Sequence, residues 1–147
     1  DDMFEIRCAL EGLAIQLAID RMDEEHLAKI KDVFELMEFY TAKKDQEKIN
    51  DLNILYHETI YQATQSQYFE QLLKDVHYYV SVTSRHSITQ PERLETAIQE
   101  HRAILNSIVA GDKELAKDTI QKHIRKTQTL VRAYYANKKK KNNKVND

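Results

Sequence analysis

The fold is decided most clearly by residues 49–60, which read INDLNILYHETI. From Ile49 to Ile60 the apolar side chains recur at spacings of three and four, the period of one face of an α-helix. Asn53 and His57 fall on that same face. The stretch therefore predicts a helix that turns two polar groups inward among apolar neighbours.

Two later stretches show the same pattern, a polar residue on an apolar helical face. Residues 94–108 and 116–134 carry apolar side chains at the same helical spacing, with His101 on the face of the first and His123 on the face of the second. Three predicted helices therefore bury one histidine each.

Composition predicts helices for the rest of the chain as well. Among 147 residues there are only two glycines and one proline, and good helix formers are abundant. Pro91 suits a first helical turn, and Gly111 followed by Asp112 is typical of a helix end and a new N-cap. We therefore predict an all-α fold, an antiparallel bundle of six or at most seven helices. The six expected helices span residues 2–20, 23–41, 45–64, 68–86, 92–110 and 113–135.

Length and charge indicate one domain. We expect one helical domain at residues 1–136 and a basic, disordered tail at residues 137–147, which holds five lysines against one aspartate. The net charge is −2, so the body without the tail is acidic and a poor partner for nucleic acid. Cys8 is the single cysteine and no apolar run is long enough for a bilayer, so we expect a cytoplasmic protein without membrane contact.

Other side chains are assigned to packing. The stripe of the first helix is expected in the core, and the remaining histidines are expected at the surface or as packing residues. The core stripe of the first helix is Ile6, Leu10, Leu13 and Leu17. The fourth helix is expected to add Phe69, Leu72, Val76 and Val80 to the core. The remaining histidines are His26, His77 and His86.

The three inward histidines have two possible interpretations, as hydrogen-bonded core residues or as metal ligands. A single histidine on an apolar face is usually a hydrogen-bonded core residue. Three such rings are costly to bury, whereas one shared divalent metal would satisfy a nitrogen of each. Asn53, one turn before His57, could add a carbonyl oxygen. Such ligands suit Zn²⁺ or Ni²⁺, and also Mn²⁺ or Fe²⁺.

Catalytic motifs are missing from the sequence. The glutamate that a di-iron bundle needs three residues before each histidine is replaced by Ile54, Ile98 and Ile120. His57-Glu58 lacks the second histidine of a zinc protease, because Tyr61 stands there. We therefore expect no enzyme. A metal-dependent enzyme with a three-histidine site and a metal-free helical interaction module stay as alternatives.

Five short motifs follow one another along nearly the whole chain. They are Glu5-x-Arg7-x-x-x-Glu11, Asn53-x-x-Tyr56-His57, Glu100-His101-Arg102-x-Ile104, Gly111-Asp112 followed by Ala116, and His123 twenty-two residues after His101. In this order they resemble the FCD domain, the ligand-binding C-terminal domain of FadR-subfamily regulators in the GntR family of bacterial transcription factors.

The resemblance implies a function. Such a domain is a helical bundle with a central metal and a small carboxylate effector, joined to an N-terminal winged helix that binds operator DNA as a homodimer. That winged helix is expected to be missing from this chain, which starts at Asp1. We therefore expect a ligand-sensing and dimerisation domain whose partners are a small organic acid and a second copy, with operator DNA reached only through the missing domain.

The resemblance also implies site residues. Asn53, His57, His101 and His123 fall on positions similar to the family's metal ligands, and Arg7 falls on an arginine that holds the effector. The family usually has aspartate at the first ligand position. Asparagine there should weaken metal binding and leave the site one charge more positive. Near the end of the fourth predicted helix, Arg85 is a second candidate for effector binding.

Overall fold

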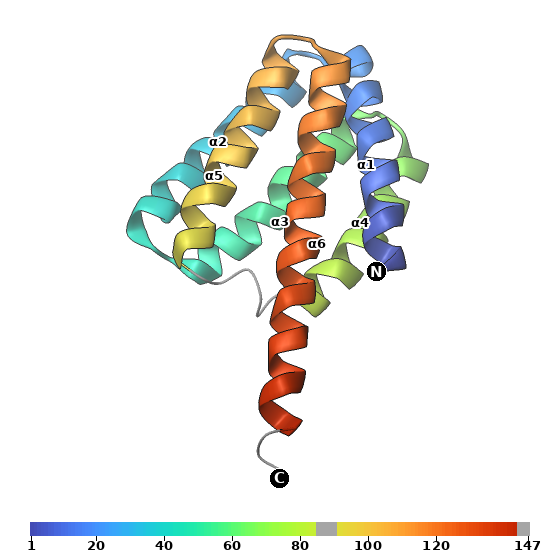
Figure 1. Cartoon of the computed structure of the whole chain (residues 1–147). Helices are drawn as coiled ribbons and strands as arrows, with labels where there is room; N and C mark the ends of the chain where they lie inside the picture. The colour runs from blue at the N-terminus through green and yellow to red at the C-terminus, as the bar shows by residue number, and fades with distance from the viewer. Residues whose placement is uncertain (85–90, 144–147) are drawn as a thin grey trace.

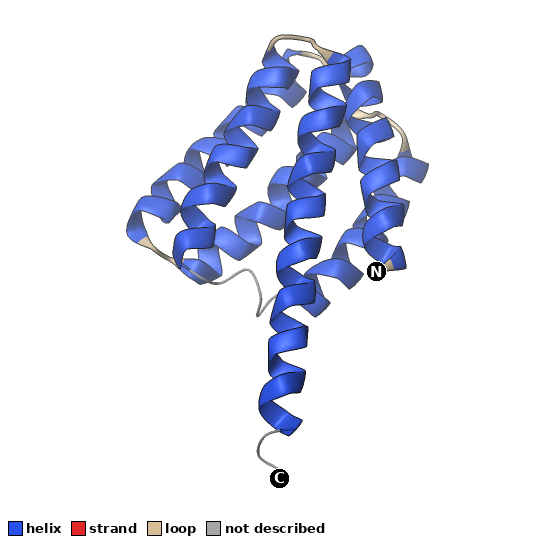
Figure 2. Ribbon diagram, in the orientation of Figure 1, coloured by secondary structure: helices blue, strands red, loops and turns tan. Residues whose placement is uncertain are grey.

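The computed structural model describes residues 1–84 and 91–143 and contains six α-helices and no strand within them (Figure 2). The all-α bundle predicted from the sequence is confirmed, and every helix begins within one residue of its expected start. The helices are α1 (Asp2–Arg21), α2 (Glu24–Lys43), α3 (Gln46–Ala63), α4 (Gln67–Ser84), α5 (Pro91–Val109) and α6 (Lys113–Asn143).

Helix ends follow the expected cap chemistry. Asp23 and Asp45 each accept a hydrogen bond from the backbone N–H three residues later, at 2.9 and 3.1 Å. Gly111 takes a left-handed conformation with φ of 67° after α5. The Asp112 side chain then accepts a hydrogen bond from the backbone N–H of Leu115 at 3.0 Å. These caps turn α5 sharply into α6, so the two form a hairpin.

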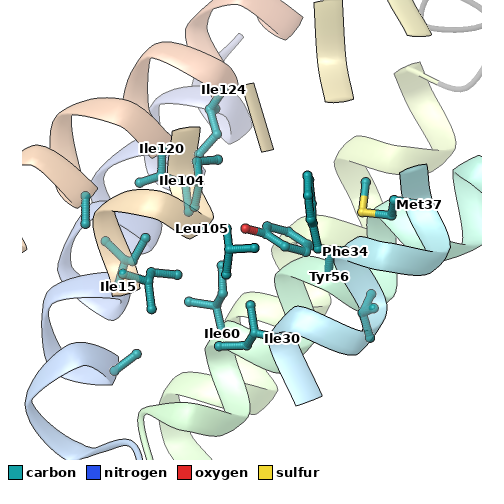
Figure 3. Packing of buried hydrophobic residues seen from close by; sticks show 14 of the residues in the cluster. Ile15, Ile30, Phe34, Met37, Tyr56, Ile60, Ile104, Leu105, Ile120 and Ile124 are labelled. Carbon is teal, nitrogen blue, oxygen red and sulfur yellow. The ribbon is translucent and has the colours of Figure 1, made fainter. Parts of the chain in front are cut away.

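The helices pack around one main core. α6 contacts α1 and α5, whereas α3 contacts α1, α2 and α4 (Figure 1). The rings of Phe34 of α2 and Tyr56 of α3 pack edge to face, with centroids 6.3 Å apart. Figure 3 shows them next to each other in the core. The Tyr56 hydroxyl also donates a hydrogen bond of 3.1 Å to the backbone carbonyl of His101, which ties α3 to α5. The largest fully buried aliphatic side chains are Ile15, Ile30, Ile60, Leu73, Ile104, Ile120 and Ile124.

Helix α1 buries only part of the face predicted for the core: Leu10 packs against buried residues, whereas Ile6 and Leu13 do not. Ile6 and Leu13 were expected in the core, but they are 45% and 46% exposed. The buried face instead carries Phe4, Cys8 and Ile15. Both faces of α1 hold apolar side chains, and the helical period shows which residues share a face without showing which face is buried. Leu72 of α4, also predicted in the core, is 48% exposed.

Helix α6 is longer than expected. We predicted its end at residue 135 and a disordered tail from residue 137, but the helix continues to Asn143 and projects beyond the bundle (Figure 1). This part of the prediction is corrected. No glycine or proline interrupts residues 136–143, and lysine is a good helix former, so nothing in the sequence stops the helix at Tyr135. None of the described helices combines the length and apolar character needed to span a membrane.

Candidate metal centre

Three histidines from three helices meet in the bundle. His57 of α3, His101 of α5 and His123 of α6 are all buried, with at most 5% of each residue exposed. One ring nitrogen of each lies within 4.8 Å of the corresponding nitrogens of the other two. The ring centroids are 4.5 to 5.6 Å apart. The three inward faces singled out in the sequence therefore share one point.

Each ring is oriented by a hydrogen bond from its Nδ1 atom. The acceptors are two carboxylates and one backbone carbonyl, which have no proton to give, so the proton lies on Nδ1 and the lone pair on Nε2. The three pairs, each 2.7 Å long, are His57 with Glu11 Oε2, His101 with the carbonyl oxygen of Ala97, and His123 with Glu100 Oε2.

The Nε2 atoms are the ones left to bind a ligand. Those of His57 and His101 are fully buried and have no hydrogen-bond partner in the part of the chain that the structure describes. A buried acceptor without a donor costs about 1–3 kcal/mol. Imidazoles that donate Nδ1–H to a carboxylate or carbonyl and turn Nε2 to a common point are typical of metal ligands in proteins. The residues present therefore fit a divalent metal.

Burial keeps two of these rings neutral, as metal binding requires. It lowers the pKa of His123 to about 4, although the hydrogen bond to Glu100 opposes this shift. It also holds the pKa of His101 well below its ordinary value, and the neighbouring His123 and His57 add to the effect. Both imidazoles consequently carry a free lone pair at neutral pH.

The carboxylates behind the rings are ionised. Burial disfavours the charged form of Glu11, but Arg7 and His57 outweigh it and hold the pKa of that carboxyl well below its ordinary value. Arg7 Nε donates to Glu11 Oε1 at 2.5 Å. Burial likewise opposes ionisation of Glu100, but hydrogen bonds from His123 and Arg93 lower its pKa. Each carboxylate is thus neutralised by its own arginine. Neither carboxylate would therefore compensate the positive charge of a bound metal.

A cavity of about 50 Å³ is lined by His101 and His123. Asn53 and Arg7 both line it, and Arg7 is buried with its Nη2 atom lacking any partner within the described residues. Arg85 lies outside the described residues. The wall also includes Arg93, His77 and the apolar Met37, Leu94 and Ile98.

Three residues of this region were not predicted as functional from the sequence: Glu11, His77 and Arg93. Glu11 was part of the first motif, four residues after Arg7, and this spacing alone signals an ion pair on one helix. His77 lies four residues after Leu73 and three before Val80, so it shares their buried face, and it is itself buried. Arg93 stood next to a predicted core leucine and gave no such signal.

The chain matches a known family over this whole region. The profile of the FCD domain matches residues 2–126, a span that contains Arg7, the three histidines and both carboxylates. This chain belongs to the FCD domain family. The resemblance read from the five motifs is thereby confirmed.

The curated relatives of this FCD domain are transcription regulators. The HTH-type transcriptional regulator YdhC of Bacillus subtilis is 31% identical over 125 residues, which are 84% of this chain and 55% of the relative. The HTH-type transcriptional regulator McbR of Escherichia coli is 24% identical over 116 residues, 78% of this chain and 52% of the relative. The chain thus spans about half the length of these relatives.

Solved structures agree on the fold. E. coli McbR/YncC superposes with a TM-score of 0.83 at 20% identity, covering 92% of this chain and 65% of that one. A GntR protein of Streptococcus agalactiae superposes with a TM-score of 0.74 at 19% identity, covering 90% of this chain and 57% of that one. The six-helix arrangement is therefore that of the family.

Proposed function

We propose that this FCD domain is the metal-dependent sensor of a bacterial transcription regulator. In this proposal His57, His101 and His123 hold one divalent metal, with Asn53 beside them. The observation that carries it is that one ring nitrogen of each histidine lies within 4.8 Å of the other two, while the buried Nε2 atoms of His57 and His101 have no hydrogen-bond partner among the described residues. A metal-free interaction module would leave these acceptors unsatisfied at a cost to stability.

The chemistry of the proposed ligands limits which metals can bind. Three neutral imidazoles and an amide oxygen favour Zn²⁺ or Ni²⁺, and Mn²⁺ or Fe²⁺ also accept such ligands. Asn53 brings no charge where the family usually has aspartate, so we expect weaker binding than an aspartate site would give. When bound, the metal supplies a Lewis-acidic centre for an anionic oxygen.

The proposed effector is a small organic acid. Arg7 donates its Nε–H group to Glu11, and its buried Nη2 atom has no partner among the described groups. The Arg7 side chain is part of the cavity wall. A carboxylate can accept from that N–H group and balance the positive charge left at the centre. A cavity of about 50 Å³ has room for only a few water molecules and favours a short carbon chain.

Effector binding would act by linking several helices through one shared ligand. The proposed contacts come from α1 through Arg7, from α3 through His57, and from α5 and α6 through His101 and His123. A ligand shared by four helices stabilises one packing arrangement over another, which is the differential binding that allostery requires. In the full-length cytoplasmic regulator, this change would alter operator binding by a separate winged-helix domain.

A homodimer belongs to the same proposal. α1 and α4 pack against each other, and both carry exposed apolar side chains. Tyr68, Leu72 and Val82 lie at helical spacing on α4, and Ile6 and Leu13 lie seven residues apart on α1. Exposed apolar rows of this kind mark interaction surfaces, and a second copy is the partner that a dimeric regulator provides.

A thermal-shift experiment tests the effector. Melting of the metal-free and the Zn²⁺-loaded domain is followed with a panel of short carboxylates. We expect at least one acid to raise the melting temperature of the loaded domain only. Arg7→Lys should abolish this rise, because the single ammonium of lysine lacks the forked guanidinium that can donate to Glu11 and to a ligand in two directions. Arg102→Lys, at a surface arginine paired with Glu38, is the matched control and should respond like wild type. Equal shifts with and without metal would contradict the proposal.

A further inference from the structure

The last helix ends in a basic segment that lies outside the bundle. Residues 136–143 of α6, which we call the α6 extension, continue past the other helices (Figure 1). Their sequence is ANKKKKNN, so they contain four lysines and no acidic residue. At the helical rise of 1.5 Å per residue, these eight residues reach about 12 Å beyond Tyr135. The side chains of Lys138 and Lys139 are exposed there.

The positive charge of the extension is not compensated within the described chain. Lys138 and Lys139 have no carboxylate at ion-pair distance among the residues that the structure describes. Nearer the bundle the situation differs, because Lys122 of the same helix pairs with Asp118 at 2.6 Å. The sequence explains the difference, since no aspartate or glutamate lies between Asp118 and Asp147. The charge of the extension is therefore available to an outside partner.

Helix stability and packing do not account for these lysines. A cation near the C-terminus of a helix interacts favourably with the helix dipole, but the effect is confined to the last turn. Lys138 and Lys139 lie before the last turn, which ends at Asn143. Ala136 is the single apolar residue of the extension, so the extension has no apolar face that could pack on a protein or enter a bilayer. A partner of the extension must therefore be bound by charge.

The extension leaves the bundle beside the first residue of the chain. Arg132 Nε of α6 donates a hydrogen bond of 2.7 Å to Asp1 Oδ1, one helical turn before the extension begins. A domain joined in front of Asp1, such as the winged helix proposed above, would therefore start next to the extension. DNA held by that domain would be brought to the same end of the molecule as the lysines.

The complementary partner is duplex DNA. Its backbone presents one negative charge per about 1.7 Å of helix axis, and lysine binds phosphate as a point charge without a strict geometry. The net charge of the whole chain is −2 although residues 137–147 hold five lysines against one aspartate, so the remaining body is acidic and repels DNA. Contact with DNA would consequently be limited to the extension.

We infer that the α6 extension binds the phosphate backbone of duplex DNA through its lysines, independently of base sequence. This contact is additional to the one expected from a separate winged-helix domain, and it requires neither the metal nor the effector. Contacts to phosphates carry no sequence information. The extension would therefore raise the affinity of a regulator for any duplex and leave the choice of operator to the winged helix.

DNA binding by this chain alone tests the inference. Fluorescence anisotropy of a labelled duplex of about 20 base pairs is measured at about 30 mM salt and above. We expect binding that weakens roughly tenfold for each doubling of the salt concentration, the slope of about four phosphate contacts. A duplex of unrelated sequence should bind within about twofold of the first. Absence of binding at low salt, or binding that salt does not weaken, would overturn the inference.

A pair of double variants localises the contact. Lys138→Gln combined with Lys139→Gln should lower the affinity at least tenfold and reduce the salt slope by about two, because two phosphate contacts are lost. Lys31→Gln combined with Lys48→Gln makes the same change of net charge at exposed lysines of α2 and α3 and should bind within about twofold of wild type. Equal weakening in both would mean that overall charge, and not the extension, attracts DNA.

Backbone amide signals give a second readout that does not depend on variants. When the duplex is added, the signals of residues 136–143 should shift, whereas those of α2 and α5 should stay in place. Shifts spread over the body would contradict the assignment.

Other anionic partners are compared at the same salt concentration. Vesicles of phosphatidylcholine with about 30% phosphatidylserine represent a membrane surface, and polyglutamate represents an acidic protein. We expect both to bind more weakly than the duplex, and tighter binding of either would overturn DNA as the partner. Because the three histidines lie outside the extension, failure of DNA binding would leave the proposed metal-dependent sensor intact.

Discussion

At the scale of single residues, Glu11 organises the site. Its two oxygens accept hydrogen bonds from Arg7, His57 and Tyr61, all of them buried. One carboxylate therefore neutralises a guanidinium, orients a candidate metal ligand and fixes a tyrosine proton. A buried charge held by such a network cannot be removed without leaving its partners uncompensated.

Glu11→Gln should damage both stability and metal binding. It keeps the shape of the side chain but leaves Arg7 charged and unpaired in the core, which should cost about 3 kcal/mol or more of unfolding free energy. Zinc affinity should fall by roughly 10- to 100-fold, because the acceptor behind His57 is weakened. Urea unfolding in chelator and zinc titration measure the two effects. Glu35→Gln, at an exposed glutamate of α2, is the control, and equal behaviour of the two variants would contradict the assignment.

The histidines also predict the pH dependence of the metal-free domain. The pKa of His123 falls from 6.5 to about 4 on folding, so between these values the unfolded chain binds more protons than the folded one. Stability is therefore lost as the pH falls through this window, by about 3 kcal/mol from His123 alone at pH 4. The lowered pKa values of His77 and His101 act in the same direction.

Urea unfolding in chelator at pH 7, 6, 5 and 4.5 checks this expectation. His123→Gln should show a shallower loss than wild type over the same range. Stability that stays constant from pH 7 to pH 4.5 would mean that these rings are not buried in neutral form.

The sequence predicted the three converging histidines better than their surroundings. His57, His101 and His123 were found because a polar residue on an apolar stripe is visible in the helical period alone. Their acceptors were not, because the contact between His57 and Glu11 joins residues 46 positions apart on different helices. Such a pairing depends on how α1 and α3 cross, which no local pattern contains.

At the scale of helices, ends were predicted more reliably than buried faces. Asp23, Gly111 and Asp112 act where expected, because caps depend on neighbours within a few residues. The inward face of α1 was assigned only partly correctly, since Ile6 and Leu13 are exposed although they are as apolar as the residues actually buried. For α6, the absence of glycine and proline after Tyr135 predicted the end of the helix better than the lysine-rich composition, from which a disordered tail was expected.

Gly111 tests the role of the turn before α6. Its φ is 67°, and an added Cβ would meet nothing within 4 Å, so a substitution there changes backbone strain and not packing. Gly111→Ala should cost about 1 kcal/mol, a fall in melting temperature of roughly 2–4 °C. Gly111→Asn should cost less, because asparagine tolerates the left-handed region. Differential scanning calorimetry would decide, and equal losses in both variants would argue against backbone strain as the cause.

At the scale of the whole molecule, the exposed apolar rows of α1 and α4 predict self-association. Leu13→Lys and Leu72→Lys should each shift the domain from dimer to monomer in sedimentation velocity runs over a range of concentrations. Each places a charge where a second copy would have to bury it. Leu36→Lys, at a leucine of α2 that is 47% exposed, should leave the dimer intact. A wild-type domain that is monomeric throughout, or a Leu36→Lys variant that dissociates equally, would contradict this interface.

The whole account depends on one ion joining α3, α5 and α6 through three imidazoles. The most direct measurement is the metal content of the purified domain by elemental mass spectrometry, after loading and dialysis, for wild type and His101→Ala. The account predicts about one divalent ion per wild-type chain and almost none in the variant, with the helical circular dichroism of both retained. A wild-type domain that holds no metal and melts at the same temperature with and without added Zn²⁺, Ni²⁺, Mn²⁺ or Fe²⁺ would contradict it.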